Sequence, residues 1–575
     1  MMNILSLSLV LGSALASLAP SSAYVQAPVT DDMRSAAVKV LSALLPTGTT
    51  PGAVTSANSV AWQRLAYITD TFGPRFSGSD SLEEVLSWVA LTASSIDGLN
   101  VSEQPTMIPK WVRGAESATL LTPRVKKLHM VGLGESSPGN VTAPIFVVGS
   151  NEELLANCSK AAGTIVLFDV IFTTYDNTVP TRANAGLWAV ACGGVGALIR
   201  SVGPYSLQNP HTGHTMAAGI PTAAVSLEDA AQLRRMFERG QTPTVNLCME
   251  SQTFPFSPSR NLLIDLTGTD LPEEIVLLSG HGDSWDISEG AMDDGGGFVT
   301  AWEALRVLHA LGLRARRTIR AVVWVNEENG AAGGKTYANL VNLTAHSWMS
   351  ECDGGAFQPY GIGVSCAAGA DCSAAVTQLT TLGAELLAPI GSGNVSVGGE
   401  GTDIAPSCSQ GVVCSGFNVL DPRITPDTNN PCMSDSKDAW TLPTFNAANL
   451  PYDSQYFWVH HSSADTIERM DPRQLNHVAA ASAVWAYSIA LLPALLPRDA
   501  PAPSPTPSPS TLPARTPAAG VIVGSALAST ALAGAAIFFY FKVRYAAERV
   551  TSNTVYNPLV AQVASDPVFA GGAAA

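Results

Sequence analysis

The chain is poor in charged residues, and the charge it carries is acidic. Only 14% of its 575 residues are Asp, Glu, Lys or Arg, and the net charge at pH 7 is −16. Nucleic-acid binding requires a basic surface, and no basic stripe interleaved with aromatic residues is present. These properties exclude a nucleic-acid-binding protein. The hydrophobic share of 46% is enough to fill large cores in more than one domain.

Cysteine is also scarce. Nine cysteines over this length do not build a small disulfide-stabilised fold. In an oxidising compartment most should pair, and the odd number leaves at least one unpaired or intermolecular. Three of them (Cys158, Cys192 and Cys248) lie in one predicted domain. If pairs form within domains, that domain keeps one free thiol. The other six lie in a second predicted domain, where all six can pair with one another: Cys352, Cys366, Cys372, Cys408, Cys414 and Cys432.

The two ends of the chain have the patterns of membrane targeting. Residues 1–23 are typical of a signal peptide, although no basic residue precedes the apolar run, so an uncleaved anchor is the alternative. Residues 497–517 are rich in Pro, Ser and Thr and predict an extended stalk. Residues 518–541 are uncharged and long enough to span a bilayer. Residues 542–575, which begin with basic side chains, are then a cytoplasmic tail.

We therefore expect a type I membrane protein, anchored by one C-terminal span. Its catalytic domain would lie outside the cell or in the secretory or endolysosomal lumen. The segment Tyr556–Leu559 matches a Tyr-X-X-apolar sorting signal, although such short matches are often accidental. Five Asn-X-Ser/Thr sequons agree with a secretory route and predict glycosylation: Asn100, Asn140, Asn157, Asn342 and Asn394.

Between its ends the chain divides into three zones. Residues 24–118 begin with helical patterns over 36–45, 62–71 and 81–94. Residues 119–255 are rich in short strands, with a helix expected over 227–239. Residues 256–496 alternate strands with helices, the pattern of a parallel α/β sheet. No internal repeat stands out.

A second apolar stretch, residues 478–492, resembles a membrane span in composition. It follows Asp471-Pro472, which is typical of an N-cap followed by proline at the first helical position. We therefore predict that it forms the buried last helix of a globular domain.

The stretch Gly290–Gly297, GAMDDGGG, places two carboxylates side by side before three glycines. Adjacent like charges repel, and a glycine run weakens a helix. One interpretation is a turn in which Asp294 caps a helix over 295–311. The other interpretation is that Asp293 bridges two metal ions, whose positive charge overcomes this repulsion.

Acids and histidines follow three successive predicted strands, 274–279, 318–326 and 347–351. The carboxyl ends of parallel strands meet at one edge of a sheet, where open α/β sheets place their sites. The residues at these ends are His281, Asp283, Glu327, Glu328 and Asp353.

Further along the chain, residues 456–459, expected as another strand, lead to His460 and His461. Mixed His and carboxylate ligands suit zinc. Two metals need one shared anion, and each needs roughly one His and one further acid. The set that fills this arrangement is His281, Asp293, Asp353, Glu328 and His461.

Several longer motifs carry a family resemblance. They are RLAYITDTFGPRFSGS, IPKWVRGAESATLL, LIRSVGPYS with PHTG, GHGDSWD with GAMDDGGG, GEGTDI, and YFWVHHSSADT. Over nearly the whole region between its ends, the chain resembles the dinuclear zinc aminopeptidase/carboxypeptidase family. The resemblance implies an α/β fold, a zinc-exopeptidase three-layer α/β/α domain at residues 24–118 and 256–496. It also implies an inserted β-rich protease-associated domain, without catalytic residues, at residues 119–255.

The resemblance also implies roles for individual residues. One zinc would be held by His281, Asp293 and Asp353. The other would be held by Asp293, Glu328 and His461, because the family ligand lies four residues before the acid of the Asp-Thr pair. Two further roles carry over: Glu327 as general base and Asp283 as the acid that orients His281. His460, beside the chosen ligand, is a candidate substrate contact.

The implied activity is hydrolysis of small peptides, particularly dipeptides with free termini. A metal-bridged water would attack, and Glu327 would take its proton. The direction, aminopeptidase or carboxypeptidase, stays open. The resemblance also suggests a homodimer. Residues 417–454 are longer than the family pattern and precede the last ligand, so we expect them to limit substrate size.

Two other functions are alternatives to a peptidase. One is a catalytically silent, receptor-like ectodomain, which lost ligands would indicate. The other is a glutaminyl cyclase-like enzyme with one zinc. The complete set of five ligands and a base in the sequence disfavours both.

Overall fold

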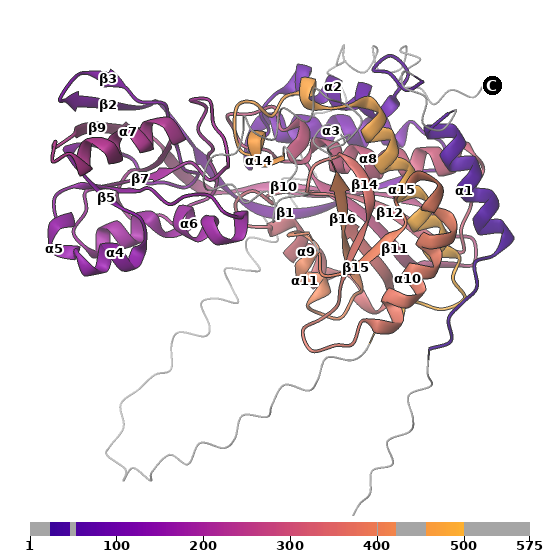
Figure 1. The fold of residues 1–575 in the computed structure, drawn as a ribbon. Coiled ribbons are helices and arrows are strands. Elements are labelled where there is room, and N and C mark those ends of the chain that lie inside the picture. Colours follow the sequence, from indigo (N-terminus) through magenta and orange to yellow (C-terminus); the bar gives the residue numbers. More distant parts are fainter. Residues whose placement is uncertain (1–23, 47–52, 400, 421–455, 499–575) are drawn as a thin grey trace, which may run out of the picture.

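The computed structural model describes residues 24–46, 53–399, 401–420 and 456–498. These residues contain two eight-stranded sheets, which lie side by side and are joined by two long strands (Figure 1). The joining strands, β1 (Asn100–Val112) and β10 (Gln252–Leu266), pair antiparallel. The chain thus leaves the first domain and returns to it at neighbouring points. We call residues 119–255 the insert and the remaining described residues the main domain.

The sheet of the main domain has the strand order β1-β10-β12-β11-β13-β16-β14-β15. Its centre is parallel, because β11 runs parallel to both β12 and β13, and β13 runs parallel to β16. Buried apolar runs form these strands, as expected where helices cover both faces. The strands not yet bounded are β11 (Leu271–His281), β12 (Arg317–Trp324), β13 (His346–Glu351), β14 (Gln358–Ser365), β15 (Asn394–Val397) and β16 (Cys414–Leu420).

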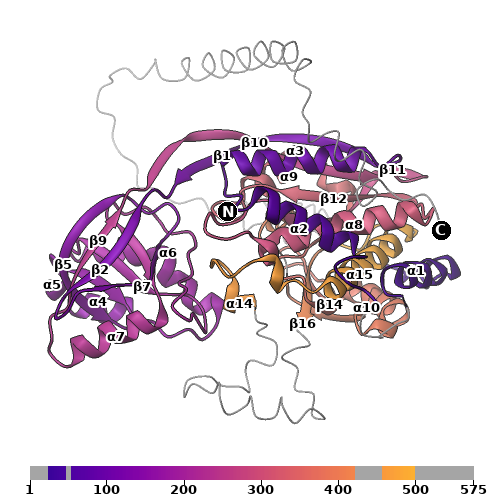
Figure 2. The same ribbon diagram turned by 90° about the horizontal axis from the view of Figure 1, so that it is seen from above.

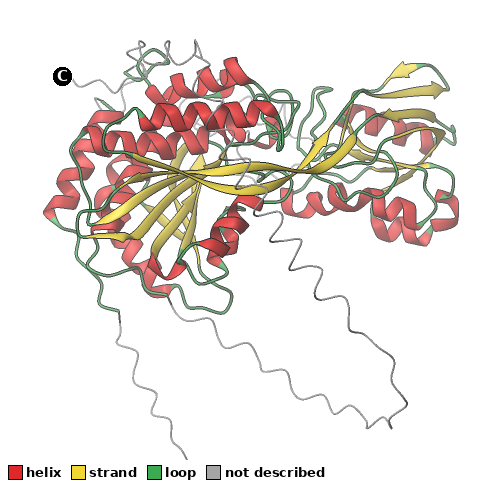
Figure 3. Cartoon of the chain, turned by 180° about the vertical axis from the view of Figure 1, so that it is seen from behind, coloured by secondary structure: helices red, strands yellow, loops and turns green. Residues whose placement is uncertain are grey.

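Helices cover both faces of this sheet (Figures 2 and 3). One face packs against a large core formed with α1 (Asp31–Leu44), α2 (Val60–Phe72), α3 (Asp80–Ser94), α8 (Gly296–Ala310), α10 (Ser373–Leu386) and α15 (Pro472–Leu491). The other face packs against α9 (Ala332–Leu340) and α11 (Ala405–Cys408) around a separate core. The prediction of an α/β domain with helices on both faces is confirmed.

The N-terminal helices lie where the sequence predicts them. Each begins at a hydroxyl side chain that accepts a hydrogen bond from a backbone N–H three residues later: Thr30 for α1, Ser59 for α2 and Ser79 for α3. Such caps satisfy backbone donors that the helix itself leaves unpaired. Local signals therefore determine where these three helices begin.

Helix α15 is the predicted buried helix. Asp471 caps it by accepting from the backbone N–H of Arg473, Pro472 is its first residue, and nearly every side chain along it is buried. Among the residues that the structure describes, no helix has the length and apolar character needed to cross a membrane. The predicted signal peptide, stalk, span at 518–541 and tail lie outside those residues and stay predictions.

The insert has a sheet of its own, in the order β3-β2-β9-β5-β6-β7-β8-β4. Its strands are β2 (Glu116–Thr122), β3 (Lys126–Lys127), β4 (Met130–Gly132), β5 (Gly139–Val148), β6 (Ile165–Phe168), β7 (Gly196–Arg200), β8 (Thr222–Val225) and β9 (Thr244–Met249). Its helices are α4 (Asn151–Ala156), α5 (Cys158–Ala161), α6 (Tyr175–Ala191) and α7 (Leu227–Glu238).

The insert is therefore mixed α/β rather than simply β-rich. Helix α7 was expected, but α6 was not. Pro180 lies inside α6, and its alternation of small and polar residues gives little helical periodicity. Packing of Ala185 and Ala189 into the core beside β7 stabilises the helix in spite of these local signals.

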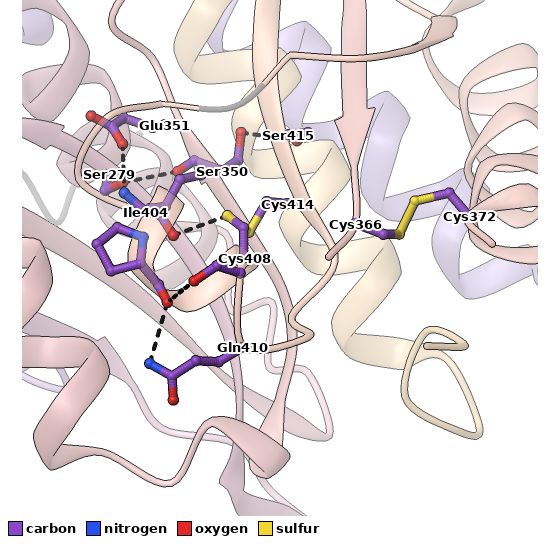
Figure 4. Close-up of a disulfide and its surroundings, with 12 residues drawn as sticks. Ser279, Ser350, Glu351, Cys366, Cys372, Ile404, Cys408, Gln410, Cys414 and Ser415 are labelled. Carbon is purple, nitrogen blue, oxygen red and sulfur yellow. Dashed lines mark hydrogen bonds between the residues drawn. A yellow bond between two sulfur atoms is a disulfide. The ribbon is translucent and has the colours of Figure 1, made fainter. Parts of the chain in front are cut away.

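Disulfides join cysteines within each domain, as predicted. Cys158 pairs with Cys192 in the insert, which keeps Cys248 as a free thiol. In the main domain, Figure 4 shows the bonds Cys366–Cys372 and Cys408–Cys414. Cys352 is a buried free thiol, so the prediction that all six cysteines of the main domain pair is wrong for Cys352. Cys432 lies outside the described residues.

The five sequon asparagines all reach the surface. Asn157 is half-buried, and the other four are exposed: Asn100, Asn140, Asn342 and Asn394. Their glycosylation stays a prediction.

Candidate metal centre

The predicted ligands meet at one edge of the main sheet. His281 is the last residue of β11, Glu328 follows β12 and Asp353 follows β13. These strands are neighbours and parallel, so their carboxyl ends open onto the same space. Asp293 reaches that space from the segment before α8, and His461 from the chain after α14 (Tyr456–Val459).

The first group of side chains surrounds the ring of His281. Its Nε2 lies 3.2 Å from Oδ1 of Asp293 and 3.5 Å from Oδ1 of Asp353. One donor atom from each of these three residues lies within 4.8 Å of the others, which suits a single metal ion. This is the predicted ligand set of the first zinc.

The second group lies on the other side of Asp293. Nε2 of His461 is 3.3 Å from Oδ2 of Asp293 and 3.0 Å from Oε2 of Glu328. Asp293 therefore turns one carboxylate oxygen toward each group. A carboxylate shared in this way is the bridge that a two-metal site needs.

His460 lies closer to this centre than its sequence position indicates. Its Nε2 is 3.4 Å from Oδ2 of Asp293, and its ring stacks on that of His461 at 3.6 Å. Asp293, His460 and His461 also form a group compatible with a metal ion. Of the two histidines, only His461 has an ion pair with Glu328 among the described residues. This contact favours His461 as the ligand.

Several atoms of the site are buried and lack a hydrogen-bond partner among the described residues. They are Nε2 of His281, Oδ2 of Asp293 and both carboxylate oxygens of Glu328. Leaving a buried polar atom unsatisfied costs about 1–3 kcal/mol, and more for a charged group. These are also the atoms that a divalent cation would bind, so the residues present fit zinc.

Electrostatics point to the same need for positive charge. Burial opposes a charged His281 ring, but the carboxylates of Asp293 and Asp353 outweigh burial and hold its pKa well above the usual value. Burial, followed by the charge of Asp293, raises the pKa of Glu328 well above its usual value. Burial, followed by the charge of Asp353, raises the pKa of Glu327 to about 8. Metal ions would relieve this crowding of carboxylates.

Asp283 contacts the site differently from the predicted arrangement. Nδ1 of His281 lies 2.9 Å from the backbone carbonyl of Asp283 and 4.0 Å from its carboxylate. Because a carbonyl only accepts, it places the proton on Nδ1 and leaves Nε2 free for a metal. The Asp283 carboxylate instead accepts from the backbone N–H groups of Glu327 and Glu328 and from the Ser77 hydroxyl.

The two adjacent aspartates have separate partners. The contacts of Asp294 agree with the cap interpretation of GAMDDGGG, and the bridging role of Asp293 stays a prediction. Asp294 accepts from the backbone N–H of Gly297 at 3.1 Å, as a cap, and from that of His281 at 3.1 Å. Asp293 faces the candidate metals. The glycines allow close approach, since a Cβ on Gly297 would lie 2.1 Å from the Cys352 carbonyl oxygen.

Asp465 contacts the segment that carries Asp293, a position that the sequence does not predict for it. Its two carboxylate oxygens accept from the backbone N–H groups of Met292, at 2.7 Å, and Asp293, at 3.0 Å. Asp465 therefore holds the segment that carries the bridging carboxylate. The Asp-Thr pair four residues after His461 was the available signal.

The insert also reaches the site, although it supplies none of the predicted ligands. The backbone N–H of Thr212 donates to the carbonyl of His461 at 2.8 Å, where His461 has a left-handed φ of 57°. Nη1 of Arg182 lies 3.4 Å from Nδ1 of the same histidine. Asn329, next to Glu328, donates to Glu135 of the insert at 2.9 Å. The PHTG motif at 210–213 was the only sequence signal for these contacts.

The segment before the two histidines is not the expected strand. Tyr456–Val459 forms α14, and the backbone N–H of His460 donates to the Tyr456 carbonyl at 2.8 Å. Aromatic residues favour strands, but here the rings pack on the insert. Phe457 stacks on Tyr175 and contacts Phe172. This tertiary packing overrides the local preference.

Two cavities adjoin the candidate metal centre. The larger cavity, of about 560 Å³, is lined by Glu327, Glu328 and Lys335 of the main domain and by His214 of the insert. The smaller cavity, of about 190 Å³, is lined by residues that include Glu351 and Asp353. Thr402 lines both.

The predicted size-limiting segment, 417–454, is described only at its start. There Phe417 and Asn418 line the smaller cavity. The rest lies outside the described residues, so its effect on substrate size stays a prediction.

Comparisons with known proteins agree with this arrangement. The pattern of "Peptidase family M28" matches residues 261–486. Carboxypeptidase Q of Mus musculus is 38% identical over 441 residues, which cover 75% of this chain and 85% of the mouse protein. Carboxypeptidase Q of Homo sapiens is 37% identical over 444 residues, which cover 76% of this chain and 86% of the human protein.

Solved structures support the fold. A peptidase M28 precursor from Shewanella amazonensis SB2B has a TM-score of 0.68 at 24% identity, covering 81% of this chain and 98% of its own. A zinc aminopeptidase from Bacillus subtilis has a TM-score of 0.53 at 20% identity, covering 74% and 93%. Both alignments extend over the main domain and much of the insert.

Proposed function

Because the chain belongs to peptidase family M28, and is a zinc metallopeptidase by that kinship, we propose that it is a two-zinc exopeptidase for small peptides. Its preferred substrates would be dipeptides with free termini. The observation that carries the proposal is the position of Asp293, with one oxygen toward His281 and the other toward His461.

The chain's own residues would hold the two ions in two overlapping sets. His281, Asp293 and Asp353 form the first set, and Asp293, Glu328 and His461 form the second. When bound, zinc would polarise the scissile carbonyl and bring the pKa of a water molecule toward neutrality. Asp465 and Asp283 would keep the ligand-bearing segments in place through their hydrogen bonds to backbone N–H groups.

Glu327 is the group best placed to move the proton. Its carboxylate lies 4.0 Å from Nε2 of His281, and its side chain is 15% exposed and lines the larger cavity. It is therefore within reach of both the metal centre and a bound peptide. In this proposal Glu327 takes a proton from the attacking water and returns it to the leaving amine. His460, beside Asp293, would contact the substrate.

Metal analysis combined with a substrate panel tests this function. The full-length protein, purified in detergent, should contain two zinc ions per chain by atomic emission. It should hydrolyse free dipeptides faster than longer peptides. A folded, zinc-loaded protein that hydrolyses no member of the panel would instead support the receptor-like alternative. One zinc ion per chain, with cyclisation of N-terminal glutamine, would support the cyclase alternative.

We further propose that the enzyme is a type I membrane glycoprotein and that it forms homodimers. The apolar run at 518–541 supports the membrane anchor, and the sequons support glycosylation. The family resemblance supports the homodimer. Carbonate extraction of membranes, glycosidase treatment and light scattering of detergent-solubilised protein test the three parts separately.

A further inference from the structure

The larger cavity contains one side chain with a permanent positive charge among its described lining residues, and that side chain has no place in the proposed catalytic machinery. We propose that Lys335 forms a subsite for the α-carboxylate of the substrate. The proposal rests on the peptidase function, because it places the peptide relative to Glu327 and Glu328, which line the same cavity.

Lys335 has a hydrogen-bonding capacity that the described residues do not use up. Its ammonium donates to the carbonyl of Gly330 at 2.7 Å, and no ion pair joins it to a carboxylate in the described part of the chain. An ammonium has three N–H donors, so two remain for a ligand. The Gly330 contact also restrains the flexible side chain toward the cavity wall.

The position of Lys335 carries a local electrostatic penalty. It lies at the beginning of α9, where the positive end of the helix dipole disfavours a cation, and the first turn carries no acid to offset it. The Gly330 carbonyl offsets this penalty only in part, because it is a neutral acceptor. A bound carboxylate would supply the missing compensation for both the helix end and the ammonium.

The two cavities differ in their basic side chains, and the difference orients a dipeptide. Two acids line each cavity: Glu351 and Asp353 the smaller one, and Glu327 and Glu328 the larger one. Among the described lining residues, only the larger cavity also contains a lysine, Lys335, beside the apolar side chains of Ala405 and Pro406. A dipeptide held with its scissile bond at the metals would therefore direct its C-terminal carboxylate to Lys335. This arrangement favours substrates that end one residue after the scissile bond.

A charge-matched substrate set tests the subsite. Wild type and Lys335→Met would be compared on Ala-Leu, on its C-terminal amide, and on Ala-Asp amide, whose only carboxylate is a side chain. Lys335→Met should lower kcat/KM for Ala-Leu by roughly tenfold, mainly through KM, as expected for the loss of one charge-assisted hydrogen bond. The amide of Ala-Leu should already be poor with wild type and should not become poorer.

Control variants separate this effect from misfolding. Lys39→Met removes an exposed lysine of α1 and should change nothing. Lys335→Arg keeps the charge and should recover most of the activity on Ala-Leu. Higher salt should reduce the wild-type advantage for Ala-Leu and leave Lys335→Met unaffected.

Three results would overturn the proposal. They are wild-type kinetics of Lys335→Met on Ala-Leu, equal losses on Ala-Leu and its amide, or a loss confined to Ala-Asp amide. Calorimetry of Ala-Leu and its amide on the same zinc-loaded variants measures how much the subsite contributes to affinity, separately from turnover. If the wild type binds Ala-Leu through Lys335 but hydrolyses nothing, the subsite stands and the proposed function fails.

Discussion

The main domain and the insert contribute to the candidate site in different ways. Every proposed zinc ligand comes from the main domain. The insert instead holds the segments that carry the ligands through hydrogen bonds. Its Thr212 donates to the His461 carbonyl, and its Glu135 accepts from Asn329, which follows Glu328. The comparison teaches that a domain without ligands can still determine where the last ligand and the cavity wall lie. The main domain supplies the proposed ligands, and contacts from both regions fix the positions of these ligands.

The largest expected effect is on the main-domain side, at Glu327. Glu327→Gln keeps the shape of the side chain and removes the base. Zinc content should therefore stay near the wild-type level, while kcat falls by about 10⁴-fold, the upper end for loss of a general base. Zinc by atomic emission and dipeptide turnover measure the two quantities.

The neighbouring Glu328→Gln serves as the matched variant. It should weaken zinc binding, because its carboxylate faces His461 at 3.0 Å, and excess zinc should restore part of the activity. Zinc loss in Glu327→Gln with retention in Glu328→Gln would show that the two roles are exchanged.

A smaller effect is expected where the two regions join, at Arg113. Its guanidinium holds Asp286 of the main domain at 2.6 Å, and it donates to the carbonyl of Gly132 in the insert. Arg113→Met should let the insert shift, which would move Thr212 relative to His461. Misplacing catalytic groups by about 1 Å can reduce activity about 10²-fold, so we expect a 10- to 100-fold loss in kcat/KM with zinc retained.

Arg124→Met, which removes an exposed arginine of the insert, is the control and should be neutral. If Arg113→Met instead lost zinc in proportion to activity, the insert would be needed for the ligand set itself, and the contrast between the regions would disappear.

The regions should also differ in how they respond to a broken ion pair. In the main domain Glu303 pairs with Arg64 at 3.1 Å, and both side chains are 1% exposed. Glu303→Gln leaves the buried Arg64 charge uncompensated and should destabilise the domain by roughly 3–5 kcal/mol. In the insert, Asp229 pairs with Lys126, whose side chain is 23% exposed and can reach water.

Asp229→Asn should therefore destabilise the insert less, by roughly 1 kcal/mol. Hydrogen exchange resolved by domain measures both changes. Equal losses of stability in Glu303→Gln and Asp229→Asn would mean that burial of the paired cation does not determine the size of the loss.

Acid should weaken the main domain through His346. His346 accepts from the Tyr337 hydroxyl at 2.7 Å and donates to the Asn342 carbonyl at 3.0 Å. Burial lowers its pKa to about 4. Below pH of about 6.5 the unfolded chain takes up this proton, whereas the native state does not. The stability that the neutral His346 contributes should thus be fully present above pH 6.5. It should fall by at most roughly 3 kcal/mol as the pH drops to 4.

Asp229 of the insert acts in the same direction as His346, but at lower pH. Burial opposes its ionisation, but hydrogen bonds from Lys126 and His129 outweigh burial and hold its pKa below 3.8. Its contribution is present above pH 3.8 and is lost only below that. Hydrogen exchange from pH 7 to 4 should show that the main domain loosens around His346. His346→Gln should flatten that dependence, and an unchanged slope would remove His346 as its cause.

The sequence by itself determined the features that depend on neighbouring residues. Hydroxyl caps placed α1, α2 and α3, and Asp471-Pro472 placed α15. Runs of apolar residues ending in His or acid indicated which strands deliver ligands, because a parallel sheet brings the carboxyl ends of its strands together. The family spacing then selected His461 over His460. These are local or repeated patterns, which survive without knowledge of the packing.

Tertiary structure alone decided the features that depend on distant parts of the chain. Only packing on the insert makes Tyr456–Val459 a helix, and only the folded chain shows Asp283 serving His281 through its carbonyl. The contact of Thr212 with His461 joins residues on two different domains. No local pattern encodes such contacts, because each depends on the positions of elements that lie far apart in the sequence. The sequence thus specified which residues carry the chemistry, and the fold specified what holds them in place.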